Sequence, residues 1–318
     1  MKAFRTAIAG LGKIGFECDV NTAKKYVLSY ARAFSLHKGF ELAAGFDIDR
    51  SKLDAFEEKY KVPGYHYKDL KGNLSDIDAV VISTPAENHF KVFKAVISSC
   101  KPRMIIMEKP LALNLKQARE IVTISKKKKI LLYVNYFRRV DPGISKLKQY
   151  IVQKKWGRLK HVDIFYGQDL LSNGSHFIDL MIYLLGNPER VKLLRSRDRN
   201  NPDFIFYYKQ LLIFFKSSIG IDYYLKDMDF VFENSRVRYS RFSLTQLMLP
   251  TDKSCFGVKE LIDVSSKDLH LDVERYMLTV AGHIYNVLSG KGKLVSTGQT
   301  ALQTLEVCFD IMKKGTKA

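Results

Sequence analysis

The chain has few cysteines: Cys18, Cys100, Cys255 and Cys308 are widely scattered, and no two of them form a CxxC pair. This argues against a disulfide framework and against a zinc or other metal site, and it fits a reducing compartment. The sequence also lacks any apolar run near the roughly 20 residues that a membrane-spanning helix needs. The first residues, MKAFRTAIAGLGKIG, hold a short apolar stretch broken by glycines and Lys13, which is typical of a strand and turn rather than of a signal peptide. We therefore expect a cytoplasmic protein.

Acidic residues are also scarce. The sequence has 33 Asp and Glu against 52 Lys and Arg, so its formal net charge is +19 and its pI is near 9.6. The basic residues are spread along the chain, apart from a run at 126–129 that closes a helical pattern, where cations suit the C-terminal dipole. No motif for binding nucleic acid accompanies them. We interpret the excess as attraction for anionic ligands such as dinucleotides and nucleotide-linked sugars, and we expect neither nucleic acid nor a membrane as partner.

The length of 318 residues suits two domains rather than one compact core. In the first part, apolar stretches alternate with helical segments, which indicates βαβ units and a parallel sheet. Five strands are expected. One ends near Asp47, and the others lie at 4–9, 77–84, 103–108 and 129–136. The expected helices run from Gly15 to about residue 37 and over 51–60, 90–100 and 115–128, with Ser51 as a predicted N-cap.

The second part of the sequence has a different residue pattern. Aromatic-rich segments at 161–167, 204–209, 211–218, 220–226, 230–235 and 236–242 follow one another closely, which indicates a mostly antiparallel, open-faced sheet. Helices are expected at 175–186, with Gly186 as its C-cap, and at 272–288 and 299–314. The predicted fold class is α/β, with a Rossmann-type, doubly wound domain over 1–135 and an α+β substrate-binding domain over 136–318. Its aromatic sheet face predicts a homodimer or homotetramer.

A glycine pattern follows the first expected strand. Gly10-x-Gly12-x-x-Gly15 in that context indicates dinucleotide binding, because the glycines permit a tight turn, close approach of a pyrophosphate and close packing of the next helix. Asp47, at the end of the second strand, is the expected acceptor for a ribose hydroxyl, which favours NAD and leaves NADP as the alternative. A second interpretation of Asp47 is a plain helix cap. The interval from Gly15 to Asp47 exceeds the usual ~20 residues, which predicts either a lengthened first helix or an insertion around 17–26.

Further motifs occur in one order along the chain: STPAENH at 83–89, IIMEKPLALN at 105–114, VNYFRRVDP at 134–142, NGSHFIDLMIYLLG at 173–186 and STGQTALQTLEVC at 296–308. In this combination the chain resembles the Gfo/Idh/MocA family (glucose-fructose oxidoreductase, inositol dehydrogenase and rhizopine catabolism) over nearly its whole length. The resemblance implies an NAD(P)-dependent oxidoreductase that transfers a hydride between nicotinamide and a secondary alcohol or ketone of a sugar, nucleotide-sugar or cyclitol.

The resemblance also implies two catalytic side chains. Lys109 of the Glu108-Lys109-Pro110 motif would reach substrate and nicotinamide, and an ammonium in a partly desolvated cleft beside NAD⁺ has a lowered pKa that suits proton relay. Pro110 fixes one backbone angle and is compatible with a cis bond before it. His176 would be the acid/base, because imidazole titrates near neutral pH. The structural alternatives are a solvated lysine at a strand end and a buried histidine on an apolar helix.

Other positions follow from the turn and from the resemblance. The predicted cofactor-binding residues are Gly10, Gly12, Lys13, Ile14, Gly15, Asp47, Thr84, Pro85, His89, Glu108 and Lys109. The predicted substrate-binding residues are Tyr136, Arg138, Asn173 and Asp179. Capping of the next helix is the alternative for His89, and a position facing the helix side is the alternative for Glu108. An interdomain salt bridge is the alternative for Arg138, and we favour it for Arg139.

One position departs from the family pattern. Many members carry an acid one helical turn before the catalytic histidine, where this chain has Ser172. A hydroxyl cannot act as a carboxylate base, so Asp169 becomes a candidate for acid assistance and the identity of the substrate stays open. The departure supports one alternative, a catalytically inactive, cofactor-binding regulatory protein. A second alternative, which the resemblance suggests, is a dehydrogenase of a non-sugar substrate.

Overall fold

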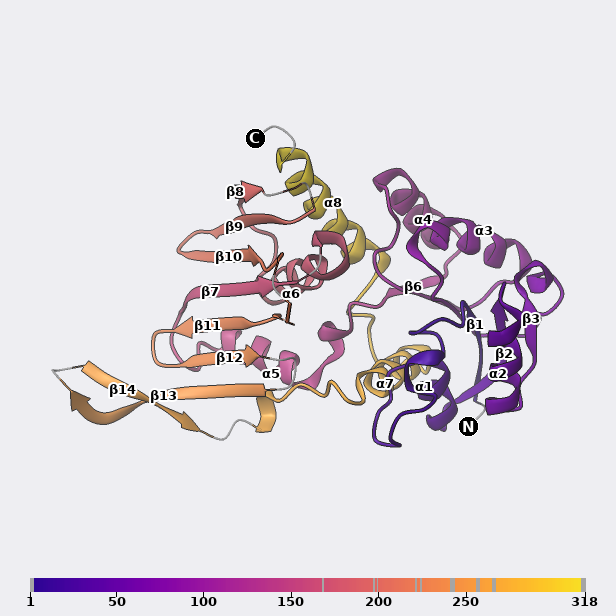
Figure 1. Cartoon of the computed structure of the whole chain (residues 1–318), viewed down its shortest axis with the longest axis horizontal. Coiled ribbons are helices and arrows are strands. Elements are labelled where there is room, and N and C mark those ends of the chain that lie inside the picture. Colours follow the sequence, from indigo (N-terminus) through magenta and orange to yellow (C-terminus); the bar gives the residue numbers. More distant parts are fainter. Residues whose placement is uncertain are drawn as a thin grey trace. The chain divides into compact units, whose positions relative to one another are not determined.

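The computed structural model describes residues 3–315 except 168, 197, 199, 221, 224, 241–243, 256–257 and 265–266. The chain forms two compact units, Met1–Val140 with Glu274–Gln303, and Asp141–Val273 with Thr304–Ala318 (Figure 1). The predicted boundary at 135 placed everything that follows in the second domain. In the structure, helix α7 (Tyr276–Leu288) returns to the first unit, because its apolar side chains, Met277 and Ile284 among them, are buried in that unit's core.

The first unit contains a six-stranded parallel sheet in the order β3-β2-β1-β4-β5-β6. Its strands are β1 (Phe4–Ala9), β2 (Phe40–Asp47), β3 (Gly64–His66), β4 (Ala79–Ile82), β5 (Met104–Met107) and β6 (Leu131–Val134). Its other helices are α1 (Tyr30–Leu36), α2 (Arg50–Tyr60), α3 (His89–Ser99) and α4 (Leu115–Lys127). Strands β4 and β5 are apolar and buried at every residue, as expected of a parallel sheet covered on both faces. The Rossmann prediction is confirmed, and the strand order reverses between β1 and β4, where such sheets bind ligands.

An insertion interrupts the first helix. Tyr30 N donates to Ile14 O at 3.0 Å and Ala31 N donates to Gly15 O at 3.0 Å, so α1 continues the helical turn that starts at the glycines. The residues between them, which include the short helix η1 (Glu17–Asp19), loop out from this helix. Of the two predicted alternatives the insertion is therefore confirmed, and the prediction of one helix from Gly15 to 37 is wrong.

A buried carboxylate holds the insertion. Asp19 is 1% exposed, and its Oδ2 accepts hydrogen bonds from Leu28 N at 2.6 Å and Ser29 N at 2.9 Å. Its Oδ1 accepts from Ser29 Oγ at 2.6 Å. Ser29 in turn caps α1 by accepting from Arg32 N at 3.2 Å. The loop thus ends in a fixed N-cap, so the helix restarts with its first donors satisfied.

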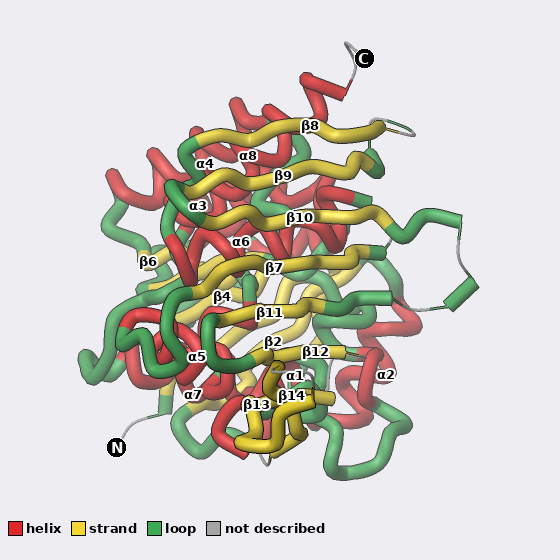
Figure 2. The backbone as a smooth tube through the Cα atoms, turned by 90° about the vertical axis from the view of Figure 1, so that its left-hand side faces the viewer, coloured by secondary structure: helices red, strands yellow, loops and turns green. Residues whose placement is uncertain are grey.

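The second unit contains an eight-stranded sheet in the order β14-β13-β12-β11-β7-β10-β9-β8, antiparallel except for the pair of β7 and β10. Its strands are β7 (Leu159–Tyr166), β8 (Arg190–Ser196), β9 (Pro202–Tyr208), β10 (Leu211–Ser217), β11 (Met228–Phe232), β12 (Arg236–Ser240), β13 (Leu244–Cys255) and β14 (Val258–Val264). Helices α5 (Pro142–Val152), α6 (Ser175–Leu185) and the end of α8 (Gly298–Gly315) bury their apolar residues with one face of the sheet (Figure 2). The predicted mostly antiparallel sheet is confirmed.

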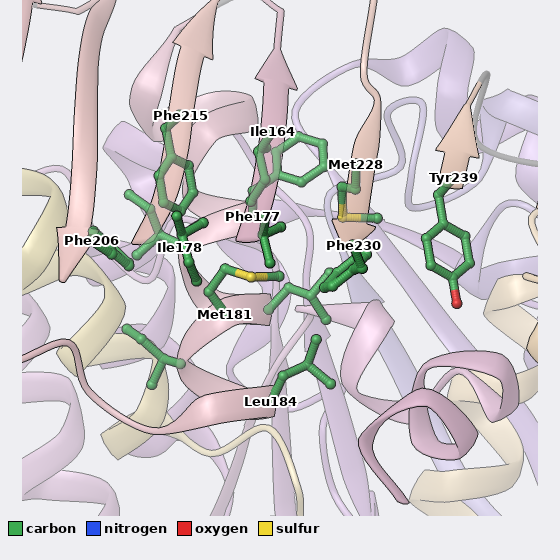
Figure 3. Packing of buried hydrophobic residues seen from close by; sticks show 14 of the residues in the cluster. Ile164, Phe177, Ile178, Met181, Leu184, Phe206, Phe215, Met228, Phe230 and Tyr239 are labelled. Carbon is green, nitrogen blue, oxygen red and sulfur yellow. The ribbon is translucent and has the colours of Figure 1, made fainter. Parts of the chain in front are cut away.

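The core of this unit lies between α6 and the sheet. Figure 3 shows Phe177 and Met181 of α6 facing Ile164 of β7, Phe215 of β10 and Phe230 of β11. Alternate residues of each strand supply these side chains, as the period of two requires. The helix that carries the NGSHFID motif is therefore anchored on a rigid sheet.

Several local predictions differ from the structure. The described residues of segment 220–226 form a loop, so the strand predicted there is wrong. Strands β8, β13 and β14 were not predicted, because they carry no aromatic residues, and α5 was also missed. The N-cap of α2 is Asp49 rather than Ser51, since Asp49 Oδ1 accepts from Ser51 N at 2.9 Å. In the part of the chain that the structure describes, no helix combines the length and apolarity that crossing a membrane requires.

Candidate active site

The glycine turn after β1 is tightly enclosed on one side and open on the other. Gly10 has φ +101°, and a Cβ there would lie 2.6 Å from Thr84 N. A Cβ on Gly15 would lie 2.0 Å from Gly10 O, whereas a Cβ on Gly12 would have only the tip of Lys52 nearby, at 4.0 Å. The backbone at Gly12 can therefore be approached closely by a ligand, as a pyrophosphate requires.

This steric difference gives a first prediction. Gly15→Ala is expected to lower the melting temperature by several degrees and to abolish NAD binding, because its methyl group meets a backbone atom and overpacking costs about 1–3 kcal/mol or more. Gly12→Ala is expected to leave the melting temperature unchanged and to weaken NAD binding alone. Thermal unfolding and cofactor titration would measure both. Gly282→Ala, on α7 with nothing near its added Cβ, is the control, and an equal effect there would contradict the interpretation.

Asp47 is fastened to the glycine turn. Its Oδ2 accepts from Leu11 N at 2.7 Å, and its Oδ1 accepts from Ile48 N at 2.8 Å and Asp49 N at 3.0 Å. The cap of α2 is Asp49, so the interpretation of Asp47 as a plain helix cap is not needed. A carboxylate has about four acceptor positions, which leaves Asp47 capacity for a ribose hydroxyl.

Two charged residues lie near the open side of the turn. Lys13 is exposed in the turn itself, as predicted for a cofactor contact, while Ile14 is half-buried beside it. Lys52 was not predicted, although its Nζ lies near Gly12 and 3.8 Å from Glu17 Oε2. The position of Lys52 in the first turn of the helix that follows Asp47 could have indicated this contact. A second ammonium here raises the positive potential where phosphates would bind.

The loop after β4 contacts the glycine turn and contains a buried hydroxyl. Ser83 Oγ donates to Gly10 O at 2.8 Å. Thr84 Oγ1 is buried and has no hydrogen-bond partner among the described residues, and such groups usually serve a ligand or water. Pro85, the third predicted residue of this loop, precedes a short helix at Ala86–Asn88. This loop lies where the strand order reverses, and its orphaned hydroxyl fits a dinucleotide.

His89 supports two loops. It is 1% exposed and opens α3, its Nδ1 lies 2.9 Å from Pro110 O and its Nε2 lies 2.9 Å from Thr84 O. Burial lowers the pKa of His89. Both ring nitrogens face backbone carbonyls, so His89 joins the loop after β4 to Pro110. Its contact with the cofactor stays a prediction.

Glu108 anchors the segment that carries Lys109. Its Oε1 accepts from Tyr30 Oη at 2.9 Å and from Asn135 Nδ2 at 2.7 Å, so it faces α1, the alternative that the sequence left open. Burial beside this carboxylate raises the pKa of Tyr30 well above its ordinary value. Lys109 is half-buried, and the Lys109–Pro110 bond is cis, as predicted. The backbone on both sides of Lys109 is therefore held, by Glu108 before it and by His89 on Pro110 after it.

The residues after β6 are buried. Tyr136 is 1% exposed, Arg138 is 5% exposed and Arg139 is 4% exposed. Arg139 Nη1 donates to Val295 O at 3.2 Å within the first unit, and the favoured salt bridge of Arg139 stays a prediction. The guanidinium of Arg138 lies 4.8 Å from the ring centroid of Phe137. Substrate contacts of Tyr136 and Arg138 stay predictions.

In the second unit, a π-helical turn (Leu170–Gly174) leads into α6. Such turns are frequent at functional sites. Asp169 caps it: its Oδ1 accepts from Ser172 N at 2.7 Å and its Oδ2 from Ser172 Oγ at 2.7 Å. Ser172, which replaces the acidic residue of the family pattern, thus binds the carboxylate of Asp169. Asn173 and His176, on the same stretch, are 7% and 9% exposed.

Asp179 connects α6 to α8 by a hydrogen bond. It is 0% exposed, and its Oδ1 accepts a hydrogen bond from Thr304 Oγ1 of α8 at 3.0 Å. A fully buried carboxylate bonded to a neighbouring helix stabilises the packing of α6 on α8. The substrate contact of Asp179 stays a prediction.

Comparison with known proteins agrees with this geometry. Residues 4–136 match the family described as GFO_IDH_MocA, oxidoreductase family, NAD-binding Rossmann fold. The first part of the chain is thus similar to the Gfo/Idh/MocA family. The match covers β1 to the end of β6, and it includes the glycine turn, the Thr84 loop and the Glu108–Pro110 segment.

Named relatives show how far the likeness extends. An uncharacterized oxidoreductase, YhhX of Escherichia coli, is 29% identical over 179 residues, which are 48% of this chain and 50% of that protein. Inositol 2-dehydrogenase of Salmonella paratyphi B is 25% identical over 176 residues, 54% of this chain and 46% of that protein. The chain thus matches about half the length of these curated relatives. The solved structure of UDP-N-acetylglucosamine 3-dehydrogenase from Acidithiobacillus ferrooxidans has TM-score 0.73 at 15% identity and covers 98% of both chains, which shows a shared fold.

The match to an NAD-binding Rossmann family lies within the first unit. The residues present fit a dinucleotide on structural grounds. The open backbone at Gly12 and the ammonium groups of Lys13 and Lys52 suit its phosphates. Asp47 suits a ribose, and the buried Thr84 hydroxyl lies at the strand-order reversal.

Proposed function

We propose that the protein is an NAD-dependent oxidoreductase that interconverts a secondary alcohol and a ketone on a sugar-like compound. The observation that carries the proposal is the arrangement at the carboxyl ends of three adjacent strands. The glycine turn follows β1, the Thr84 loop follows β4, and the Glu108–Lys109–Pro110 segment follows β5. Ligands of doubly wound sheets bind at such ends, at the strand-order reversal.

The proposed chemistry divides between two side chains. A bound nicotinamide supplies the acceptor or donor of hydride. In the direction of oxidation, the hydroxyl proton of the substrate passes to the imidazole of His176, and the C–O bond becomes a carbonyl as the carbon loses hydride. Lys109 relays this proton: its neutral amine accepts it from the hydroxyl, and the ammonium that forms stabilises the negative charge on the oxygen before it passes a proton on to His176.

The hydrogen bonds that fix the backbone beside Lys109 suit this lysine to a catalytic role. A catalytic group must be held closely in place for its pKa and orientation to serve the reaction. Tyr30 and Asn135 fix the carboxylate of Glu108 on one side, and His89 fixes the carbonyl of Pro110 on the other. The lysine is thus presented by a segment with little freedom.

The net charge of +19 favours an anionic substrate, such as a nucleotide-linked sugar or a phosphorylated sugar. Mixing the purified protein with NAD⁺ or NADH and a panel of sugars, cyclitols and nucleotide-sugars, and following the absorbance of the reduced nicotinamide, would test the function. Tight cofactor binding without turnover across the panel would instead support a regulatory protein of this fold, the alternative that Ser172 favours. Turnover of a non-sugar alcohol alone would support the other alternative.

A second prediction concerns the cofactor. Asp47→Ser is expected to raise the ratio of NADPH to NADH efficiency by about tenfold or more, because it removes a negative charge that would repel a 2′-phosphate and an acceptor for the ribose hydroxyl. Steady-state kinetics with both cofactors would measure the ratio. Asp49→Ser, which changes the cap of α2 with the same loss of charge, should leave the ratio unchanged. Equal preference in the wild-type protein would contradict the assignment of Asp47.

We also propose that the protein associates with itself, as a homodimer or homotetramer, through the sheet of the second unit. The sheet carries partly exposed aromatic residues on the face opposite the helices, among them Phe165, Tyr207 and Phe214. Light scattering of the purified protein would show its oligomeric state.

A further inference from the structure

Strand β14 forms one edge of the eight-stranded sheet. It pairs with β13 on one side, and among the described residues no strand pairs with its other side (Figure 1). Six of its seven residues are exposed, and three of these are apolar: Val258 is 70% exposed, Leu261 47% and Ile262 51%. An edge strand with exposed apolar side chains is a template for pairing with another chain.

Two of the three charged residues of β14 are arranged symmetrically. Lys259 and Asp263 lie two residues before and two residues after Leu261, which is the middle residue of the strand. Proteins often protect an edge by charges that repel a second copy. Here the two charges have opposite sign, so an antiparallel second copy would meet attraction at both positions.

We propose that β14 pairs antiparallel with β14 of a second copy of this chain, across a two-fold axis at Leu261. Leu261 then faces its own counterpart, and Val258 faces Val264. Lys259 faces Asp263 on both sides of the axis, which gives two ion pairs from one register. Such a contact is isologous, as in most homodimers, and it joins the two sheets into one.

The register is specific. It is the only antiparallel alignment that pairs all seven residues of β14. A shift by one residue in one direction places Glu260 opposite Asp263, and a shift by two in the other places Glu260 opposite its own copy. A parallel pairing in register would place Lys259 opposite Lys259 and Asp263 opposite Asp263. The number of paired residues and the pairing of opposite charges therefore both favour the antiparallel register centred on Leu261.

The pairing can be tested by reversal of charge. Sedimentation or light scattering over a series of concentrations is needed, because a contact of one strand pair falls in the small, transient class of interfaces. Lys259→Glu and Asp263→Lys are each expected to weaken association about tenfold or more, since each converts two opposite-charge pairs into like-charge pairs. An equimolar mixture of the two variants should associate again, because both pairs of the mixed dimer join opposite charges.

The control is Glu260→Lys, which changes the net charge by the same amount as Asp263→Lys at a position that faces Ile262. Its association should match that of the wild type, and thermal unfolding should show all variants folded. The proposal is overturned if the wild type is monomeric throughout, if the reversals leave association unchanged, if the mixture does not recover, or if the control weakens association equally. None of these outcomes depends on the proposed catalysis.

Discussion

Lys109→Ala is expected to lower kcat/KM by about three orders of magnitude, within the range found for positioned acid–base groups. The ammonium is proposed to stabilise the substrate oxygen and relay its proton, and an alanine does neither. Affinity for NAD should change little, because the glycine turn, Asp47 and Thr84 stay in place. Steady-state kinetics and a cofactor titration on the same preparation would separate the two effects.

Two further variants sharpen this result. Lys109→Arg should stay strongly impaired, since a guanidinium keeps its proton at any working pH and has a different shape. Lys91→Ala, an exposed lysine of α3, should behave as wild type. If Lys109→Ala retained more than about a tenth of the activity, the loss would be too small for an acid–base role and the assignment would be wrong.

His176→Gln is expected to lower kcat by about a hundredfold to a thousandfold and to change the pH profile. In the direction of oxidation the imidazole must be neutral to accept a proton, so the wild-type rate should rise with pH across the range where histidine titrates. The variant should lose that rise, because an amide does not titrate. The pH dependence of kcat/KM is the decisive measurement, since a merely structural role would lower activity without removing one limb of the profile.

A matched control lies in the same unit. His270 is exposed, and His270→Gln should leave both rate and profile unchanged. Asp169→Asn tests whether the acid held by Ser172 assists the reaction, because it removes the charge and keeps one acceptor for the turn. A pH profile of His176→Gln that retains the wild-type rise would assign the titration to another group.

Local sequence pattern was enough to predict every strand of the first sheet except β3 (Gly64–His66), which has no apolar run. The other strands are apolar runs separated by helices, and a parallel sheet needs those crossovers. The glycine turn could be located because Gly10 and Gly15 have requirements that no other residue meets, and these requirements are visible in the spacing alone. The strands of the second unit were predicted only where aromatic residues marked them, so β8, β13 and β14 were missed.

Contacts between distant residues could not be predicted. Tyr30 and Asn135 hold Glu108 from 78 and 27 residues away; Tyr30 lies in none of the quoted motifs, and the motif at 134–142 that contains Asn135 does not indicate this contact. His89 and Asp179 also lie in quoted motifs, which do not indicate the burial or the hydrogen bonds of either residue. A motif records which residue types occur together, whereas exposure depends on what packs over each side chain.

The sequence by itself determined the parallel order of the first sheet, the place of the dinucleotide turn and the presence of Lys109 beside it, because each depends on periodicity or on the chemistry of adjacent residues. The spacing of Gly15 and Asp47 revealed extra residues but not their form. Only the tertiary structure decided that they loop out of a continuous helix, that α7 returns to the first unit, and which polar groups support the site. These outcomes depend on hydrogen bonds and apolar contacts between segments far apart in the chain, which no local pattern specifies.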